Sequence, residues 1–232
     1  MNITKLSSKN IVCYTKDELK NIFEISKKIE LVDEMEKQGI SMQSLASDPN
    51  KMKTLAGNIS EKTLKDTNDH EIFASVFVFV DFYGSGSEIC FELKDSFNKD
   101  KDKIITLGDL NNFRSDPPDF IIKSSDGFRE FELKRYRKGL NTDEIFQEVK
   151  KRIEHYQNGL GNTSLLFVLQ SPEGDISKVN FEELNLRIKA LNPKFRGQVL
   201  ISYNEANREM VINQVLPNLT TTRIPVQLPS QG

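Results

Sequence analysis

The chain has 232 residues, of which 37% are hydrophobic and 28% are charged, and its formal net charge is −2. This length allows one sizeable apolar core with a small appendage. No apolar run approaches the roughly twenty residues of a membrane span, and none follows Met1 as in a signal peptide, so we expect a cytoplasmic protein with no membrane partner. Cys13 and Cys90 lack CxxC spacing and there are only two histidines, which argues against a disulfide framework or a zinc site, so any metal must be held by oxygen ligands.

The N-terminal part of the chain is predicted to be helical. Thr15 and Glu18 form a capping box, and apolar residues then recur at helical spacing until Gly39, which predicts an amphipathic helix of about 22 residues. A second, shorter helix is predicted over residues 48–56. We expect residues 1–66 to form a helical appendage that packs against the core or against a homodimer partner. A helix-turn-helix that reads DNA is the alternative.

The next segments lead from an apolar run to a polar one. Residues 70–83 are densely apolar, and periodicity alone does not separate helix from strand there. Residues 89–93 alternate like a strand, and residues 104–107 suggest a further short strand. Residues 111–117 are polar and precede two apolar segments that carry the main functional signal.

Those two segments predict a β-hairpin. Residues 119–122 and 128–133 both have the composition of strands. They are separated by Ser124-Ser125-Asp126-Gly127, and Asp-Gly is a strong signal for a two-residue hairpin loop.

The hairpin brings three charged residues to one face. If Asp126 and Gly127 form the loop, Asp119 lies opposite Lys134 and diagonal to Glu132. A longer loop that pairs Lys123 with Phe128 shifts the register by two residues. Because side chains alternate with a period of two, Asp119, Glu132 and Lys134 share a face in both registers. In the first register a gap of about 7 Å, wide enough for a metal ion, separates the backbones of the two acidic residues.

Pro118-Asp119, followed after twelve residues by Glu132-Leu133-Lys134, resembles the active-site motif of the PD-(D/E)XK nuclease superfamily. The resemblance covers roughly residues 70–205. It implies an α/β protein with a restriction-endonuclease-like core, in which helices flank a mixed central β-sheet and the elements run helix, three strands, helix and strand. We assign this core to residues 67–216, after the N-terminal helical appendage. The resemblance also implies Mg2+-dependent hydrolysis of nucleic acid.

The chemistry follows from the residue types. Asp119 and Glu132, with the backbone carbonyl of Leu133, would bind one or two Mg2+ or Mn2+ ions in an all-oxygen site. Lys134 would orient or help to deprotonate the attacking water and would neutralise the phosphate. The alternative is an ordinary cross-strand ion pair on a surface hairpin.

Further candidates follow from the resemblance. Many members of the superfamily take another acidic ligand from the first helix, and Glu71 and Glu88 are the two candidates, although the helix macrodipole equally explains an acid at a helix start. Gln147 resembles a glutamine that several members direct at the active site, and a solvent-facing role explains it equally. The basic residues that we predict to bind nucleic acid directly follow the motif: Arg135, Arg137 and Lys138.

The remaining chain predicts alternating elements. Asn141 or Thr142 caps a helix that ends near Tyr156, and the next apolar run is typical of a fully buried strand. We then expect a helix and a hairpin, followed by a C-terminal tail in which prolines oppose regular structure. The predicted ranges are 165–169 for the buried strand, 180–191 for the helix, 198–203 and 209–215 for the hairpin, and 217–232 for the tail.

The sequence therefore predicts a metal-dependent endonuclease that hydrolyses phosphodiester bonds in DNA, of the restriction, defence or repair type. The acidic net charge counts against a constitutive nucleic-acid binder, but a local basic patch can face phosphates within an acidic protein. An RNA endonuclease of the same superfamily, similar to the cap-snatching enzymes, is one alternative. A nuclease-like binding module without catalytic activity is the other.

Overall fold

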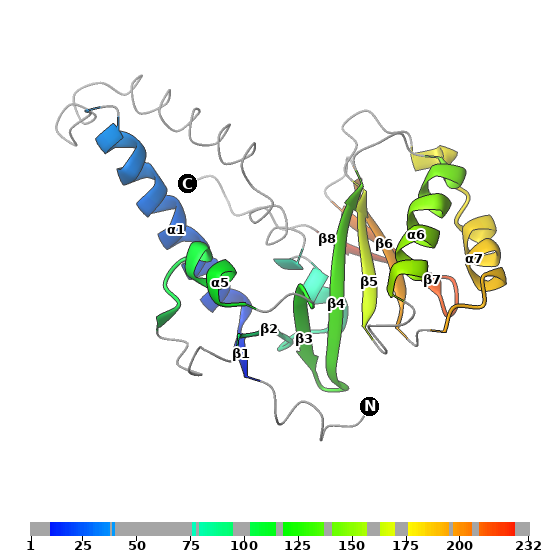
Figure 1. Cartoon of the computed structure of the whole chain (residues 1–232), viewed down its shortest axis with the longest axis horizontal. Coiled ribbons are helices and arrows are strands. Elements are labelled where there is room, and N and C mark those ends of the chain that lie inside the picture. Colours follow the sequence, from blue (N-terminus) through cyan, green and yellow to red (C-terminus); the bar gives the residue numbers. More distant parts are fainter. Residues whose placement is uncertain are drawn as a thin grey trace.

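The computed structural model describes residues 10–37, 39, 76–77, 79–94, 103–114, 118–136, 141–156, 163–169, 176–194, 197–205 and 209–225. These residues form an α/β protein with one eight-stranded mixed sheet flanked by helices (Figure 1). The helix predicted over residues 48–56 lies outside the described residues. Within the described ranges, none of the helices is both long enough and apolar enough to cross a membrane.

Each strand of the sheet lies next to the strand that follows it in the chain. Strands β4, β5 and β6 are parallel, and all other neighbours are antiparallel. The strands are β1 (Ile11–Tyr14), β2 (Glu88–Glu92), β3 (Phe120–Ser124), β4 (Gly127–Tyr136), β5 (Ser164–Leu169), β6 (Val199–Glu205), β7 (Glu209–Leu216) and β8 (Thr220–Pro225). Parallel neighbours need crossover connections, so helices follow both β4 and β5.

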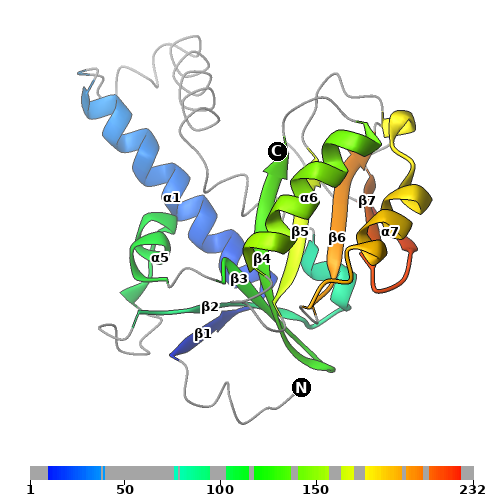
Figure 2. The same cartoon turned by 45° about the vertical axis from the view of Figure 1, so that its right-hand side comes forward.

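The helices gather in two groups, which both views of the molecule show (Figures 1 and 2). Helices α6 and α7 lie together against one face of the sheet, with α6 across β4 and β5 in Figure 2. Helices α1 and α5 lie near the β1–β3 end. The helical segments are α1 (Lys16–Lys37), the 3-10 helix η2 (Val80–Tyr83), α5 (Leu107–Phe113), α6 (Thr142–Tyr156), the 3-10 helix η4 (Ile176–Lys178) and α7 (Phe181–Ala190).

The predicted N-terminal helix is confirmed, but the described part of the predicted helical appendage also contains a strand. The Thr15 N–H donates to Glu18 Oε2 at 2.8 Å and the Glu18 N–H donates to Thr15 Oγ1 at 3.2 Å, so the capping box begins α1 as expected. However, β1 precedes α1 and pairs with β2. Val12 and Leu19 belong to the same apolar cluster as the central strands. The described part of residues 1–66 therefore contributes a strand and core residues to the main body.

Two further predictions are corrected. The C-terminal tail predicted from residue 217 contains β8, which pairs antiparallel with β7 along its length. The short strand predicted over residues 104–107 is absent from those residues. Thr106 instead caps α5: its hydroxyl accepts from the Asp109 N–H, and the Asp109 carboxylate accepts from the Thr106 N–H. The strands and helices predicted between residues 119 and 215 are all present with small differences in their bounds.

The sheet buries an apolar cluster on each face. On one face the Phe79 ring meets Phe120 and Phe131 in T-shaped contacts at centroid distances of 6.2 and 5.2 Å, and those two rings stack at 5.0 Å. On the other face α6 and α7 pack against alternate residues of β5, including Leu165 and Phe167. Both faces of the central strands are therefore covered, which explains why β5 is buried at every position.

A disulfide joins Cys13 of β1 to Cys90 of β2. The two residues are direct partners in the antiparallel ladder. The argument against a disulfide framework did not foresee this bond, because the pairing of β1 with β2 brings together cysteines whose spacing in the sequence gives no signal. The disulfide fixes the edge strand β1 to the rest of the sheet.

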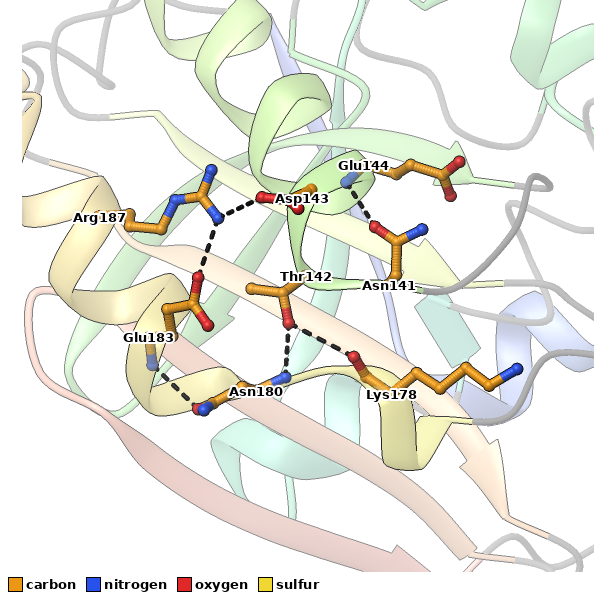
Figure 3. Close-up of polar contacts among 8 residues, drawn as sticks. All are labelled: Asn141, Thr142, Asp143, Glu144, Lys178, Asn180, Glu183 and Arg187. Atoms are coloured by element: carbon orange, nitrogen blue, oxygen red, sulfur yellow. Dashed lines mark hydrogen bonds and ion pairs between the residues drawn. The ribbon is translucent and has the colours of Figure 1, made fainter.

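The N-termini of α6 and α7 lie side by side and are hydrogen-bonded to each other (Figure 3). Asn141 and Asn180 cap the two helices through their side-chain oxygens. The buried Thr142 hydroxyl accepts from the Asn180 N–H at 2.8 Å. These bonds connect the two crossover helices to each other above the sheet face on which they pack.

Candidate functional site

The observed hairpin has the register that pairs Lys123 with Phe128. Ser124 pairs with Gly127, so the two-residue loop is Ser125-Asp126, and the prediction that Asp126 and Gly127 form the loop is wrong. Gly127 has a φ of 105° and is the first residue of β4. The Asp-Gly signal therefore predicts the position of the turn to within one residue, because the observed loop begins one residue earlier in the chain.

The candidate site lies where the β3–β4 ladder ends. The last paired residues are Phe120 and Phe131, and β4 continues alone on this side as far as Tyr136. Asp119 directly precedes β3 and donates its N–H to the carbonyl of Phe131 at 3.0 Å. Asp119 therefore stays next to β4, one residue beyond the last pair of the ladder.

The alternation of β4 decides which face the charged residues share. Phe131 and Leu133 belong to the apolar cluster around η2, whereas Tyr136 belongs to the cluster beneath α6 and α7. Because successive strand residues point to opposite faces, Glu132 and Lys134 lie on the face of Tyr136. The site is thus on the side of the sheet that α6 covers.

Asp119 is held by a main-chain donor and by a cation. Its side chain is 11% exposed. Its Oδ2 atom accepts from the N–H of Leu133 at 2.7 Å. Its Oδ1 atom lies 3.3 Å from Nη1 of Arg114, and the same nitrogen lies 3.4 Å from the Asp119 carbonyl oxygen. These contacts fix the direction of the carboxylate.

Glu132 and Lys134 form a close ion pair on the same face of β4. The distance between Glu132 Oε1 and Lys134 Nζ is 2.6 Å, and the two side chains are 4% and 24% exposed. The carboxylate is therefore almost fully removed from solvent, while the ammonium group keeps partial access to it.

The electrostatics show that the two carboxylates are close enough to interact. Burial, and then the negative charge of Glu132, raise the pKa of the Asp119 carboxyl above its ordinary value. The Leu133 N–H acts in the opposite direction, as do the positive charges of Arg114 and Lys134. The structure therefore brings together Asp119, Glu132 and Lys134, which the sequence predicted to share one face.

The donor set fits a hard divalent cation. Asp119 and Glu132 offer carboxylate oxygens, and the Leu133 carbonyl points to the same side of β4 as the Leu133 N–H that meets Asp119. Mg2+ commonly takes one or two carboxylates and completes its shell with water and phosphate oxygens. Among the described residues, no group of three or more His, Cys, Asp or Glu side chains could hold a metal. Any ion here would therefore rely on oxygens beyond those of the two acidic side chains.

Of the other predicted site residues, the structure places Glu88 away from this pair. Glu88 lies opposite Lys123 and is ion-paired with it. Lys123 is four residues from Asp119 in the sequence, which corresponds to about 13 Å along a strand. Gln147 is exposed on α6. Glu71 lies outside the described residues.

Of the three residues in the predicted basic patch, the structure describes Arg135. Arg135 follows Lys134 on β4, so it points to the opposite face of the sheet, away from the carboxylates. Arg137 and Lys138 lie outside the described residues. The position of Arg135 therefore does not support its predicted role in binding nucleic acid next to the two carboxylates.

Arg114 is the site residue that the sequence did not suggest. It directly follows α5, and its N–H donates to the Leu110 carbonyl at 2.9 Å. The signal that could have found it is the N-cap pair of Thr106 and Asp109, which marks the start of the helix whose last residue, Phe113, directly precedes Arg114.

No protein-family model and no curated protein sequence matches the chain. Among solved structures, the chain is similar to that of Pyrococcus furiosus SfsA in complex with Ca2+, with 16% sequence identity and a TM-score of 0.21. The match covers 47% of this chain and 49% of that chain. A likeness of this size carries no argument about fold or activity.

Proposed function

We propose that this protein is a metal-dependent endonuclease with a restriction-endonuclease-like core, and that it hydrolyses phosphodiester bonds in DNA. The observation that carries the proposal is the meeting of two buried carboxylates, Asp119 and Glu132, with Lys134 at the end of the β3–β4 ladder. This is the set of groups on which the resemblance to PD-(D/E)XK nucleases rests.

The order of elements around the site supports the proposal. Residues 76–77 and 79 are helical and lead into η2, and β2, β3, β4, α6 and β5 follow. This is the helix, three strands, helix and strand that the resemblance implies, with α5 inserted before β3. The parallel crossover from β4 through α6 to β5 covers the face that carries Glu132.

Burial distinguishes the site from an ordinary surface ion pair. Ion pairs on a hairpin surface stay largely in water, and each contributes at most about 1 kcal/mol. The side chains of Asp119 and Glu132 are only 11% and 4% exposed. Two acidic groups buried together are unfavourable unless cations compensate them, so this arrangement suits a site whose purpose is to hold positive charge.

The residues have separate tasks in phosphodiester hydrolysis. A bound divalent ion would lower the pKa of its water and offset charge on the phosphoryl oxygens. Asp119 and Glu132, with the Leu133 carbonyl, would hold that ion against the end of β3. Lys134 is partly exposed and lies beside Glu132, so its ammonium group is placed to orient the attacking water and to neutralise the phosphate.

The test is cleavage by the purified full chain of supercoiled plasmid, single-stranded DNA and RNA, each with Mg2+, Mn2+ or EDTA. We expect nicked or linear plasmid with either metal and none with EDTA. Asp119→Ala should abolish the reaction, whereas Asp126→Ala, which alters an exposed aspartate in the turn of the same hairpin, should retain it. Cleavage of RNA alone would replace DNA by RNA as the substrate, and metal-dependent cleavage that survives in Asp119→Ala would overturn the assignment.

A further inference from the structure

Arg114 places a positive charge on the same carboxylate that the proposed nuclease would use for its metal. Its Nη1 atom lies 3.3 Å from Asp119 Oδ1. The two side chains are 17% and 11% exposed, so solvent screens this contact only partly. The other carboxylate oxygen already accepts from the Leu133 N–H. A divalent ion that approached Oδ1 would meet the guanidinium there.

The main chain at Arg114 is held independently of this ion pair. The Arg114 N–H closes the last turn of α5 on the Leu110 carbonyl. Arg114 also forms a β-bridge with Leu93, and the Lys94 N–H donates to the Phe113 carbonyl at 2.8 Å. The guanidinium can therefore leave Asp119 without loss of the backbone that carries it.

Resting on the nuclease function proposed above, we propose that Arg114 is a positioning residue that acts as a resident counter-cation on Asp119, with which a divalent ion must compete. Two buried carboxylates repel each other, and Arg114 compensates that charge in the metal-free protein. A divalent ion held by Asp119 would repel the guanidinium, so the guanidinium would have to leave Oδ1 for the ion to bind. Arg114 thus compensates the negative charge of the metal-free site, and for the same reason it weakens metal binding.

The test is Mn2+ binding to the purified full chain, measured by electron paramagnetic resonance at a mildly alkaline pH and low salt. Arg114→Gln removes the charge and keeps a hydrogen-bond donor, and it should bind Mn2+ about tenfold more tightly, because a unit charge a few ångströms from a divalent ion is then absent. Arg114→Lys keeps the charge and should bind as the wild type does. Arg114→Met, which has a comparable apolar stem, should reproduce the effect of Arg114→Gln.

Lys123→Gln is the matched control, because it removes the same charge from the far end of β3, where Lys123 pairs with Glu88. It should leave Mn2+ affinity unchanged. The advantage of Arg114→Gln should shrink as salt is added, since screening weakens charge repulsion, whereas a purely structural effect of the substitution would persist. Melting curves of all variants establish that each is folded.

Unchanged or weaker Mn2+ binding by both Arg114→Gln and Arg114→Met would overturn the inference. An equal gain in Lys123→Gln would overturn it too, because the effect would then reflect net charge alone. Tighter Mn2+ binding by Arg114→Gln without cleavage of any nucleic acid would support the role of Arg114 and reject the nuclease. If neither the wild type nor the Arg114 variants bind Mn2+, both proposals fail.

Discussion

The backbone N–H of Leu133 donates to the Asp119 carboxylate over 2.7 Å, beyond the last paired residues of β3 and β4. Because Leu133 directly follows Glu132, the stretch of β4 that carries one carboxylate also positions the other. The relative placement of the two acidic groups thus depends on main-chain geometry more than on flexible side chains. Supporting bonds of this kind hold a site in one geometry before any ligand arrives.

The pKa of Asp119 implies that its charge destabilises the folded state. Burial and then Glu132 raise this pKa, so the folded protein holds the proton more tightly than the unfolded chain does. The proton on Asp119 stabilises the folded state fully below the ordinary carboxyl pKa of about 4. This stabilisation is lost as the pH rises through the raised pKa of the folded state. Asp119→Asn does not titrate and still offers Leu133 an acceptor. Its unfolding free energy should therefore exceed that of the wild type by an amount that grows over this window.

Urea unfolding of both proteins without metal, in steps from about pH 4 to about pH 8, measures this difference. Asp126→Asn changes an exposed aspartate of the same hairpin and should follow the wild type throughout. A gap between Asp119→Asn and the wild type that stays constant with pH would show that the Asp119 charge is not disfavoured in the folded state.

Lys134→Gln should separate catalysis from metal binding. The ammonium group lies 2.6 Å from Glu132 Oε1 and is partly exposed, so we assign it to the water and phosphate and not to the metal. Cleavage should fall by about 100-fold or more, as for loss of a positioned acid–base group, while Mn2+ still binds. Stability should fall by about 1–2 kcal/mol, because a buried carboxylate loses its cation, less than for a fully buried pair. Loss of Mn2+ affinity in this variant would contradict the assigned role.

Local sequence patterns predicted the elements between residues 119 and 215 well, but they did not predict α5 or β8. The strand pattern and turn residues before β4, and the capped helix and apolar run after it, are all local signals. The sequence does not predict strand β8, because prolines oppose regular structure, but Pro225 ends an edge strand, where a missing N–H costs little. The sequence does not predict helix α5, because residues 104–107 suggest a strand and residues 111–117 are polar, whereas the capping box at Thr106 begins a helix at Leu107.

Within the site, the alternation of side chains along a strand explains which residues the sequence predicted correctly and which it did not. Asp119, Glu132 and Lys134 share a face in either register, so the error in the loop did not affect them. Arg114 and Glu88 depend on how distant segments pair, which periodicity does not encode. Helix α5 brings Arg114 to Asp119, whereas the pairing of β2 with β3 takes Glu88 to the opposite end of β3.

The disulfide should contribute strongly to stability, because it closes a loop between residues 77 positions apart. Closing a loop of this length in the unfolded chain stabilises the folded state by about 4.5 kcal/mol in the chain-entropy description. Cys13→Ala/Cys90→Ala should unfold at lower denaturant than the wild type. Dithiothreitol should shift the wild-type curve towards that of the double variant and leave the double variant unmoved. An equal response of both proteins to dithiothreitol would show that the disulfide is not the source of the difference.

The junction of α6 and α7 should depend on one buried hydroxyl more than on its surface ion pairs (Figure 3). Thr142→Val keeps the shape of the side chain but removes the acceptor of the Asn180 N–H, and an unsatisfied buried donor costs about 1–3 kcal/mol. Asp143→Asn breaks the ion pair with Arg187, but the Asp143 side chain is 82% exposed, so the loss should stay below about 1 kcal/mol. Urea unfolding of the two variants checks the order, and equal losses would mean that the Asn180 N–H finds another acceptor when the hydroxyl is gone.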